Sequence, residues 1–204
     1  EADNYALFGT AYARKALGKH IITTQIEHHA ILHACQQLEK EGFEITYLPV
    51  DETGLISIDD LKNALRQDTI LVSIMFANNE VGTIQPIKEI CNIAQNRGSL
   101  FFTDAVQYIG SNNVDVKDLG VDMLSASAHK FYGPKGVGFL YVKKGVKLDV
   151  LLNGGHQERQ KRAGTSNVAF IVGMASALRL SRQNLLEENN KVLSLRNAFI
   201  DMTL

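Results

Sequence analysis

The sequence has few cysteines and prolines and no tryptophan: two cysteines and three prolines occur among 204 residues. Two cysteines are too few for a disulfide framework or a clustered thiolate metal site. Cys35 and Cys91 both stand in apolar patterns of helical spacing, so we expect buried thiols. This cysteine usage agrees with a reducing, cytoplasmic setting.

An excess of charge of either sign is also missing, because 21 basic residues face 22 acidic ones. Long apolar runs are missing as well. The longest are Ile70–Ala77 and Val168–Leu178, both well short of the ~18 residues that a membrane span needs. The composition therefore predicts no nucleic-acid partner and no membrane insertion. Since the chain begins at Glu1, the lack of a targeting segment says little about its cellular address.

What the sequence does contain is a regular alternation of short apolar runs with amphipathic segments. This alternation predicts an α/β fold, with a mainly parallel sheet and helices on both faces, formed by residues 1–204 as one domain. The predicted helices are Ala2–Leu17, Ala30–Lys40, Ser57–Gln67 with Ser57 as the N-cap, Pro86–Gly98 and the stretch from Phe170 onward. The predicted strands are His20–Thr24, Glu44–Val50, Thr69–Phe76, Ser99–Thr103, Asp122–Ser127 and Gly136–Lys143.

Polar residues follow four of the predicted strands, where parallel sheets bind their ligands. Asp104 comes directly after the apolar run Phe101–Thr103. A lone Asp in this place commonly caps the next helix, and its alternative role is a buried anion that holds a proton on a heterocycle. Gln107 would share its side if a helical turn follows. By themselves these two residues leave both interpretations open.

The segment Ser127–Lys130 is more specific, because one strand end delivers a serine, a histidine and a lysine together. An isolated lysine is usually a solvated surface residue. A lysine among apolar neighbours at a ligand-binding edge can instead act as a Schiff-base nucleophile or general base. Ser127 and His129 would then be free to bind a phosphate. The glycines at 133, 136 and 138 lack dinucleotide-binding or P-loop spacing, so we interpret them as turn residues.

Taken together, these motifs resemble the pyridoxal-phosphate site of the cysteine desulfurases of the NifS/IscS type, within the class-V aminotransferase superfamily. The resemblance runs over essentially the whole chain, with the motifs in the family's order. They are Glu27-His28, Asn78-Asn-Glu-Val-Gly82, Thr103-Asp-Ala-Val-Gln107, Ser127-Ala-His-Lys130 with Gly133-Pro-Lys-Gly136, and Gly154-Gly-His-Gln-Glu158 with Arg162-Ala-Gly-Thr165.

The resemblance implies a fold like the large domain of fold-type-I pyridoxal-phosphate enzymes, and it implies residue roles. Lys130 would bind the cofactor covalently and move the substrate's Cα proton. Asp104 would pair with the pyridinium nitrogen. His28 would stack on the ring and serve as an acid–base group. The remaining implied cofactor contacts are Asn79 and Gln107 around the ring, Ser127 and His129 at the phosphate, and Thr165 at a neighbouring subunit's phosphate.

The same resemblance implies an enzyme that converts L-cysteine to L-alanine and passes sulfur to an enzyme cysteine. The persulfide would supply iron–sulfur cluster or other sulfur-cofactor assembly through an acceptor or scaffold protein. Thr165 implies a homodimer, and no metal is implied.

Departures from the family pattern suggest that the chain is a large-domain fragment. Glu1 matches the last residue of the family's Gly-Ala-Thr-Glu phosphate loop, so the threonine of that loop is absent. Neither Cys35 nor Cys91 matches the family's mobile nucleophilic cysteine, and its substrate-carboxylate arginine has no counterpart. We therefore expect a missing N-terminal segment, a missing C-terminal small domain, and no activity from residues 1–204 alone.

Other functions remain open from the residues themselves. Another class-V enzyme, such as a selenocysteine lyase, would use the same cofactor site. A histidine-rich metal-binding domain is a different class: His29 and His33 stand four residues apart, on one helix face next to His28. No His-Glu-x-x-His motif or obvious third ligand accompanies them. A third possibility is a non-catalytic, partner-binding fragment.

Overall fold

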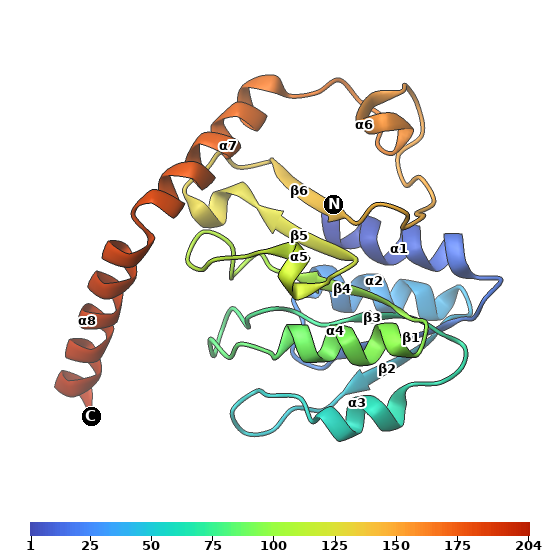
Figure 1. Cartoon of the computed structure of the whole chain (residues 1–204), viewed down its shortest axis with the longest axis horizontal. Helices are drawn as coiled ribbons and strands as arrows, with labels where there is room; N and C mark the ends of the chain where they lie inside the picture. The colour runs from blue at the N-terminus through green and yellow to red at the C-terminus, as the bar shows by residue number, and fades with distance from the viewer.

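Six strands form a single sheet in the computed structural model, which describes all residues from 1 to 204 (Figure 1). The strand order is β2-β1-β3-β4-β5-β6, and every neighbouring pair is parallel except β5 with β6. The mainly parallel sheet predicted from the sequence is therefore confirmed. The strands are β1 His20–Thr24, β2 Glu44–Leu48, β3 Thr69–Ser73, β4 Leu100–Asp104, β5 Met123–Ser127 and β6 Gly138–Val142.

Helices cover both faces of this sheet, and each face has its own apolar core. On one face, Leu7 and Ile31 from α1 and α2 pack with Ile21 and Phe102 of the sheet. On the other, helices α3 and α4 pack against the opposite side chains of the same strands. The helices are α1 Ala2–Arg14, α2 His29–Lys40, α3 Ile58–Ala64, α4 Ile87–Asn96, α5 Val116–Leu119, α6 Gln157–Gln160, α7 Val168–Gln183 and α8 Leu185–Thr203, with a 3₁₀-helix η1 at Ala128–Phe131.

Helix α8 leads away from the sheet to the C-terminus (Figure 1). None of its side chains is buried. None of the helices of the chain combines the length and the apolar character that crossing a lipid bilayer requires.

Several predicted elements end earlier than expected. The helix that Ser57 caps, by accepting the N–H of Asp60 at 3.1 Å, ends at Ala64 rather than Gln67 because Leu65 adopts an extended backbone. The strand that begins at Thr69 ends at Ser73 rather than Phe76. Similarly, the first helix ends at Arg14 and the second strand at Leu48, while the four-residue elements α5, η1 and α6 were not predicted. Periodicity over so few residues carries little signal.

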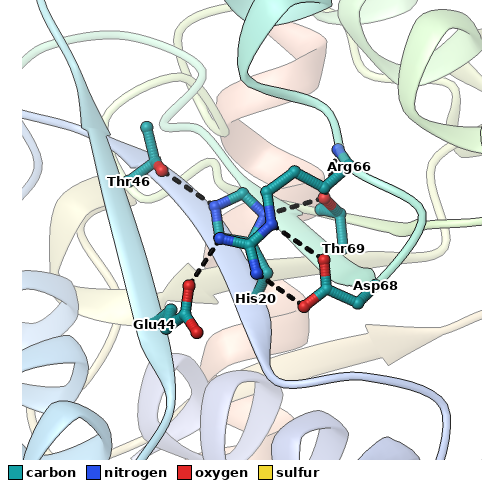
Figure 2. Close-up of polar contacts among 6 residues, drawn as sticks. All are labelled: His20, Glu44, Thr46, Arg66, Asp68 and Thr69. Atoms are coloured by element: carbon teal, nitrogen blue, oxygen red, sulfur yellow. Dashed lines mark hydrogen bonds and ion pairs between the residues drawn. The ribbon is translucent and has the colours of Figure 1, made fainter.

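A polar cluster joins the starts of three parallel strands, at the sheet edge opposite the strand ends discussed above (Figure 2). His20 begins β1 and is almost fully buried, with ring nitrogens 2.7 Å from Thr69 Oγ1 and 2.8 Å from Thr46 Oγ1. The Arg66 guanidinium lies within 2.8 Å of carboxylate oxygens of both Asp68 and Glu44. These contacts connect β1, β2 and β3 at the end of the sheet away from the candidate site.

Candidate functional site

Asp104 is the last residue of β4 and lies at the carboxyl edge of the sheet, only 6% exposed. Its Oδ1 accepts the backbone N–H of Val106 at 2.8 Å. The chain then forms a turn, in which the N–H of Ile109 binds the carbonyl of Ala105, and no helix follows. The interpretation that Asp104 caps a helix is therefore wrong, because Asp104 caps a turn instead. Gln107 lies half-buried within that turn.

The electrostatic surroundings of Asp104 are unfavourable for a carboxylate. Burial, followed by the negative charge of Asp3, raises the pKa of Asp104 to about 7. The positive charge of Lys130 acts in the opposite direction, so this lysine lies near Asp104 in space. A cation at Asp104 would stabilise its ionised form.

Ser127 ends the neighbouring strand β5, and η1 begins with the next residue. Ser127 Oγ and His129 Nδ1 are 2.8 Å apart and share a hydrogen bond. Ala128 and Phe131 are buried and anchor the 3₁₀-helix, whereas His129 and Lys130 are exposed. The expectation of a lysine enclosed by apolar neighbours is thus wrong, because the short helix directs its apolar residues into the core and its polar ones outward.

Close packing joins the turn after Asp104 to η1. Gly110 has a φ of +97°, and a Cβ built on it would overlap the Cβ of Phe131. Tyr108 stacks on Phe76, with ring centroids 3.7 Å apart and planes 7° from parallel. The first contact fixes the Asp104 turn against the segment that carries Lys130, and the second packs the same turn against the segment after β3.

His28 caps helix α2 at the end of the loop after β1. Its Nδ1 accepts the backbone N–H of Ala30 at 3.1 Å, so the neutral ring carries its proton on Nε2. The ring also lines an open groove of about 480 Å³ between α1 and α2, and neither Asp104 nor Lys130 lines that groove.

The histidines next to His28 lie at the start of helix α2. His29 and His33 are exposed, and their rings stack with centroids 5.0 Å apart. No group of three or more histidine, cysteine, aspartate or glutamate side chains could hold a metal ion. The metal-binding interpretation therefore gains no support from the structure.

The two asparagines that follow β3 differ in their surroundings. Asn79 is exposed and makes no side-chain hydrogen bond within the chain. Asn78 is buried: its Oδ1 accepts the N–H groups of Glu80 and Val81, and its Nδ2 donates to the carbonyl of Ile26 at 3.0 Å. Asn78 thus shapes the loop that presents Asn79.

Thr165 lies in an exposed loop and makes no hydrogen bond to the other predicted site residues. The same loop connects to the start of the chain, because Arg162 pairs with Glu1 at 2.8 Å. Within this chain, the structure brings Asp104 and Lys130 close together but does not join Thr165 to them.

Sequence reasoning missed two carboxyl groups at this edge of the sheet. Glu27, next to His28, is buried, and Asp3 in the first turn of α1 has one buried oxygen without a hydrogen-bond partner. The charge of Asp3 raises the pKa of Asp104, and the charge of Glu27 raises the pKa of the buried Cys35. The only signal in the sequence was an acid directly before His28, since an acid in a first helical turn is ordinary.

Comparison with known proteins finds one family that matches nearly the whole chain. The aminotransferase class-V family model matches residues 1–198. Over 200 residues the chain is 60% identical to a Clostridium botulinum protein named cysteine desulfurase IscS, covering 98% of this chain and 50% of that protein. The chain spans about half the length of the curated relatives it matches.

Two solved structures share this fold over most of the chain. A NifS-like protein superposes with a TM-score of 0.95 and 42% identity, covering 98% of this chain and 55% of the other. A structure titled SspA in complex with cysteine gives a TM-score of 0.84 and 43% identity, over 87% of this chain and 52% of the other.

Proposed function

Since this chain belongs to the class-V aminotransferase family, we propose that the protein is a pyridoxal-phosphate-dependent cysteine desulfurase. It would convert L-cysteine to L-alanine and pass the sulfur to a cysteine thiolate. The observation that carries the proposal is the placement of a buried carboxyl, Asp104, and an exposed lysine, Lys130, at the ends of adjacent strands. The similarity to a protein named cysteine desulfurase IscS, at 60% identity, selects this activity within the family.

The residues at this edge fit pyridoxal phosphate. Asp104 is a buried carboxyl whose pKa burial raises to about 7, and a protonated ring nitrogen in contact with it would stabilise its ionised form. Lys130 offers an exposed primary amine for covalent attachment. The hydrogen bond between Ser127 Oγ and His129 Nδ1 orients the imidazole and leaves Nε2 available to a phosphate oxygen.

When bound, pyridoxal phosphate withdraws electrons from the bonds at the substrate's Cα and so makes its proton acidic. The chain's own groups would do the rest. Asp104 would hold a proton on the ring nitrogen, and Lys130 Nζ would take and return the proton at Cα. His28 would face the ring and use Nε2 to move the proton of the substrate thiol.

The remaining roles concern groups around the ring and outside this chain. Asn79 and Gln107 would hydrogen-bond around the ring and the substrate. Thr165 is exposed and has no hydrogen bond to Lys130 within this chain. It would reach the phosphate bound by a second copy of the chain, so we propose a homodimer. A sulfur acceptor or scaffold protein would receive the persulfide sulfur for iron–sulfur cluster or related assembly, and a cytoplasmic location suits such exchange.

The experiment is to purify the protein at the full length of its curated relatives, load it with pyridoxal phosphate, add L-cysteine and quantify alanine and sulfide. We expect equal amounts of the two in the presence of a reductant. A parallel reaction with L-selenocysteine separates a desulfurase from a selenocysteine lyase. Alanine from selenocysteine but none from cysteine would overturn the proposal, as would a protein that binds no pyridoxal phosphate.

A further inference from the structure

Glu27 is a buried acid in the loop between β1 and α2, one residue before His28 and 5% exposed. Its Oε1 accepts two hydrogen bonds, one from Thr24 Oγ1 and one from the backbone N–H of Met75, each at 2.8 Å. Its Oε2 is also buried and has no hydrogen-bond partner. One oxygen of this carboxyl therefore accepts two hydrogen bonds, and the other has no partner.

This uneven use fits a neutral carboxylic acid. The carbonyl oxygen of an acid accepts two hydrogen bonds, while its hydroxyl oxygen carries the proton. A carboxylate would instead leave a buried, negative oxygen without a donor. The ionisable groups that act on Glu27 are Asp104 on β4 and Asp3 on α1, both acids, and Cys35 on α2 also lies close to it. None of these three groups is a cation that would favour ionisation, and burial raises the pKa of Glu27 to about 8.

The contacts of Glu27 also fix the loop that carries His28. The N–H of Met75 lies two residues beyond the end of β3, so its hydrogen bond to Glu27 connects that strand to the β1–α2 loop. A second connection, from Asn78 Nδ2 to the carbonyl of Ile26, runs in parallel. Because His28 begins α2 directly after this doubly held loop, displacing Glu27 would displace the imidazole.

We propose that Glu27 is a positioning residue: as a neutral acid it holds the His28 loop against the end of β3 and leaves Asp104 to carry the negative charge of the site. An ionised Glu27 would place another negative charge near Asp104 and oppose its ionisation. The roles of His28 and Asp104 in the site rest on the proposed function. The protonation state of Glu27 and the position of the His28 loop do not.

The first measurement uses the cofactor-free protein and does not depend on activity. Carbon-13 NMR of the glutamate carboxyls at pH 7, with the Glu27 signal assigned by its absence in Glu27→Gln, should give the shift of a protonated acid. The proton NMR chemical shifts of the His28 imidazole should be unchanged in Glu27→Gln, which keeps the accepting oxygen, and altered in Glu27→Leu, which removes it. His33, exposed on the same helix, is the control in each spectrum.

The second measurement follows cofactor binding and turnover against pH. We expect Glu27→Gln to keep the affinity for pyridoxal phosphate and kcat/KM within about threefold, and Glu27→Leu to lose about tenfold or more, as for a lost hydrogen-bonded group. Wild-type affinity should fall above about pH 8, where Glu27 ionises, and Glu27→Gln should not share that fall.

A carboxylate shift for Glu27 at pH 7, or a Glu27→Gln protein as impaired as Glu27→Leu, would overturn the proposal. If Glu27→Leu fails to fold, the wild-type and Glu27→Gln spectra and pH profiles still decide. A protein that lacks desulfurase activity, yet shows the protonated acid and unchanged His28 imidazole shifts in Glu27→Gln, would contradict the proposed function and leave this inference standing.

Discussion

The Nδ1 atom of His20 lies 2.7 Å from Oγ1 of Thr69, and the same oxygen accepts the backbone N–H of Arg66 at 2.8 Å. The hydroxyl group of Thr69 therefore connects the backbone of Arg66 to the imidazole of His20. The other ring nitrogen, Nε2, lies 2.8 Å from Thr46 Oγ1 (Figure 2). Both ring nitrogens thus have hydroxyl partners inside the fold.

This relationship predicts that acid weakens the fold through His20. Burial, and then the charge of Arg66, lowers the pKa of His20 below its ordinary 6.5, so the unfolded chain binds the proton first as pH falls. The stabilisation is complete above pH 6.5 and is lost as pH falls through the lower pKa of the folded state. Urea unfolding between pH 8 and 5 should follow this course. A His20→Gln variant should lose less stability than wild type over the same pH range. An equal loss would show that His20 is not the group responsible.

Replacing the hydroxyl partner tests the same cluster without a pH change. Thr69→Val keeps the shape of the side chain but leaves His20 Nδ1 and the N–H of Arg66 without their partner. We expect a loss of about 1–3 kcal/mol in the free energy of unfolding, as for buried polar groups left unsatisfied. Thr23→Val, in β1, is the control for the substitution itself, because the hydroxyl of Thr23 has no hydrogen-bond partner.

Asp104→Asn should separate stability from catalysis. The amide keeps an oxygen for the N–H of Val106, so the fold should survive. In the folded chain the pKa of Asp104 is about 7 against an ordinary 3.8, so wild-type stability without cofactor declines as pH rises between these values. The Asp104→Asn variant should lack this part of the stability loss with rising pH, while the ionisation of Glu27 still contributes its own part. Turnover should drop, by about tenfold for each 1.4 kcal/mol of lost transition-state stabilisation. Wild-type turnover in the Asp104→Asn variant would refute the role of Asp104 at the ring nitrogen.

Lys130→Ala should leave the fold intact, because the side chain is exposed. It should abolish the visible absorption band that pyridoxal phosphate gains on covalent attachment and any exchange of the substrate's Cα proton with solvent. Lys135→Ala, in the turn after η1, is the matched control and should keep both. An unchanged spectrum in the Lys130 variant would mean that another amine binds the cofactor.

Gly110→Ala should disrupt the contact between the Asp104 turn and η1. Gly110 and Gly98 both have a positive φ, +97° and +83°, but only at Gly110 would a Cβ meet another residue, Phe131. Gly98→Ala should therefore cost only the backbone penalty of about 1 kcal/mol. Gly110→Ala should cost more than that and weaken pyridoxal phosphate binding as well. Equal losses in the two variants, measured by urea unfolding, would show that the close approach to Phe131 is unimportant.

Neither cysteine of this chain should accept sulfur. Cys35 and Cys91 are fully buried, and burial raises the pKa of each thiol to about 12. At neutral pH neither is a thiolate, which is the reactive form. We expect residues 1–204 to form no persulfide with pyridoxal phosphate and L-cysteine, and both thiols to react with Ellman's reagent only after denaturation. A persulfide found by mass spectrometry on either cysteine would contradict this.

Much of the fold could be predicted from the sequence because its signals are local. The β-branched run at residues 20–24 and the N-cap at Ser57 depend on near neighbours, and the structure confirms both. Element ends were less accurate: the regular strand from Thr69 ends at Ser73, although the N–H groups of Ile74 and Phe76 still donate to carbonyls of β4. Hydrogen bonds between strands, which define those ends, involve residues far apart in the chain.

For the site, the sequence by itself determined which groups are present: a carboxyl after one strand, a lysine after the next, and a histidine after the first. Only the tertiary structure decided their surroundings. It buried Asp104, left Lys130 exposed, and gave Glu27 two partners on one oxygen, including Met75 from another strand. Burial and electrostatic environment are sums over neighbours from distant parts of the chain, so no local pattern contains them.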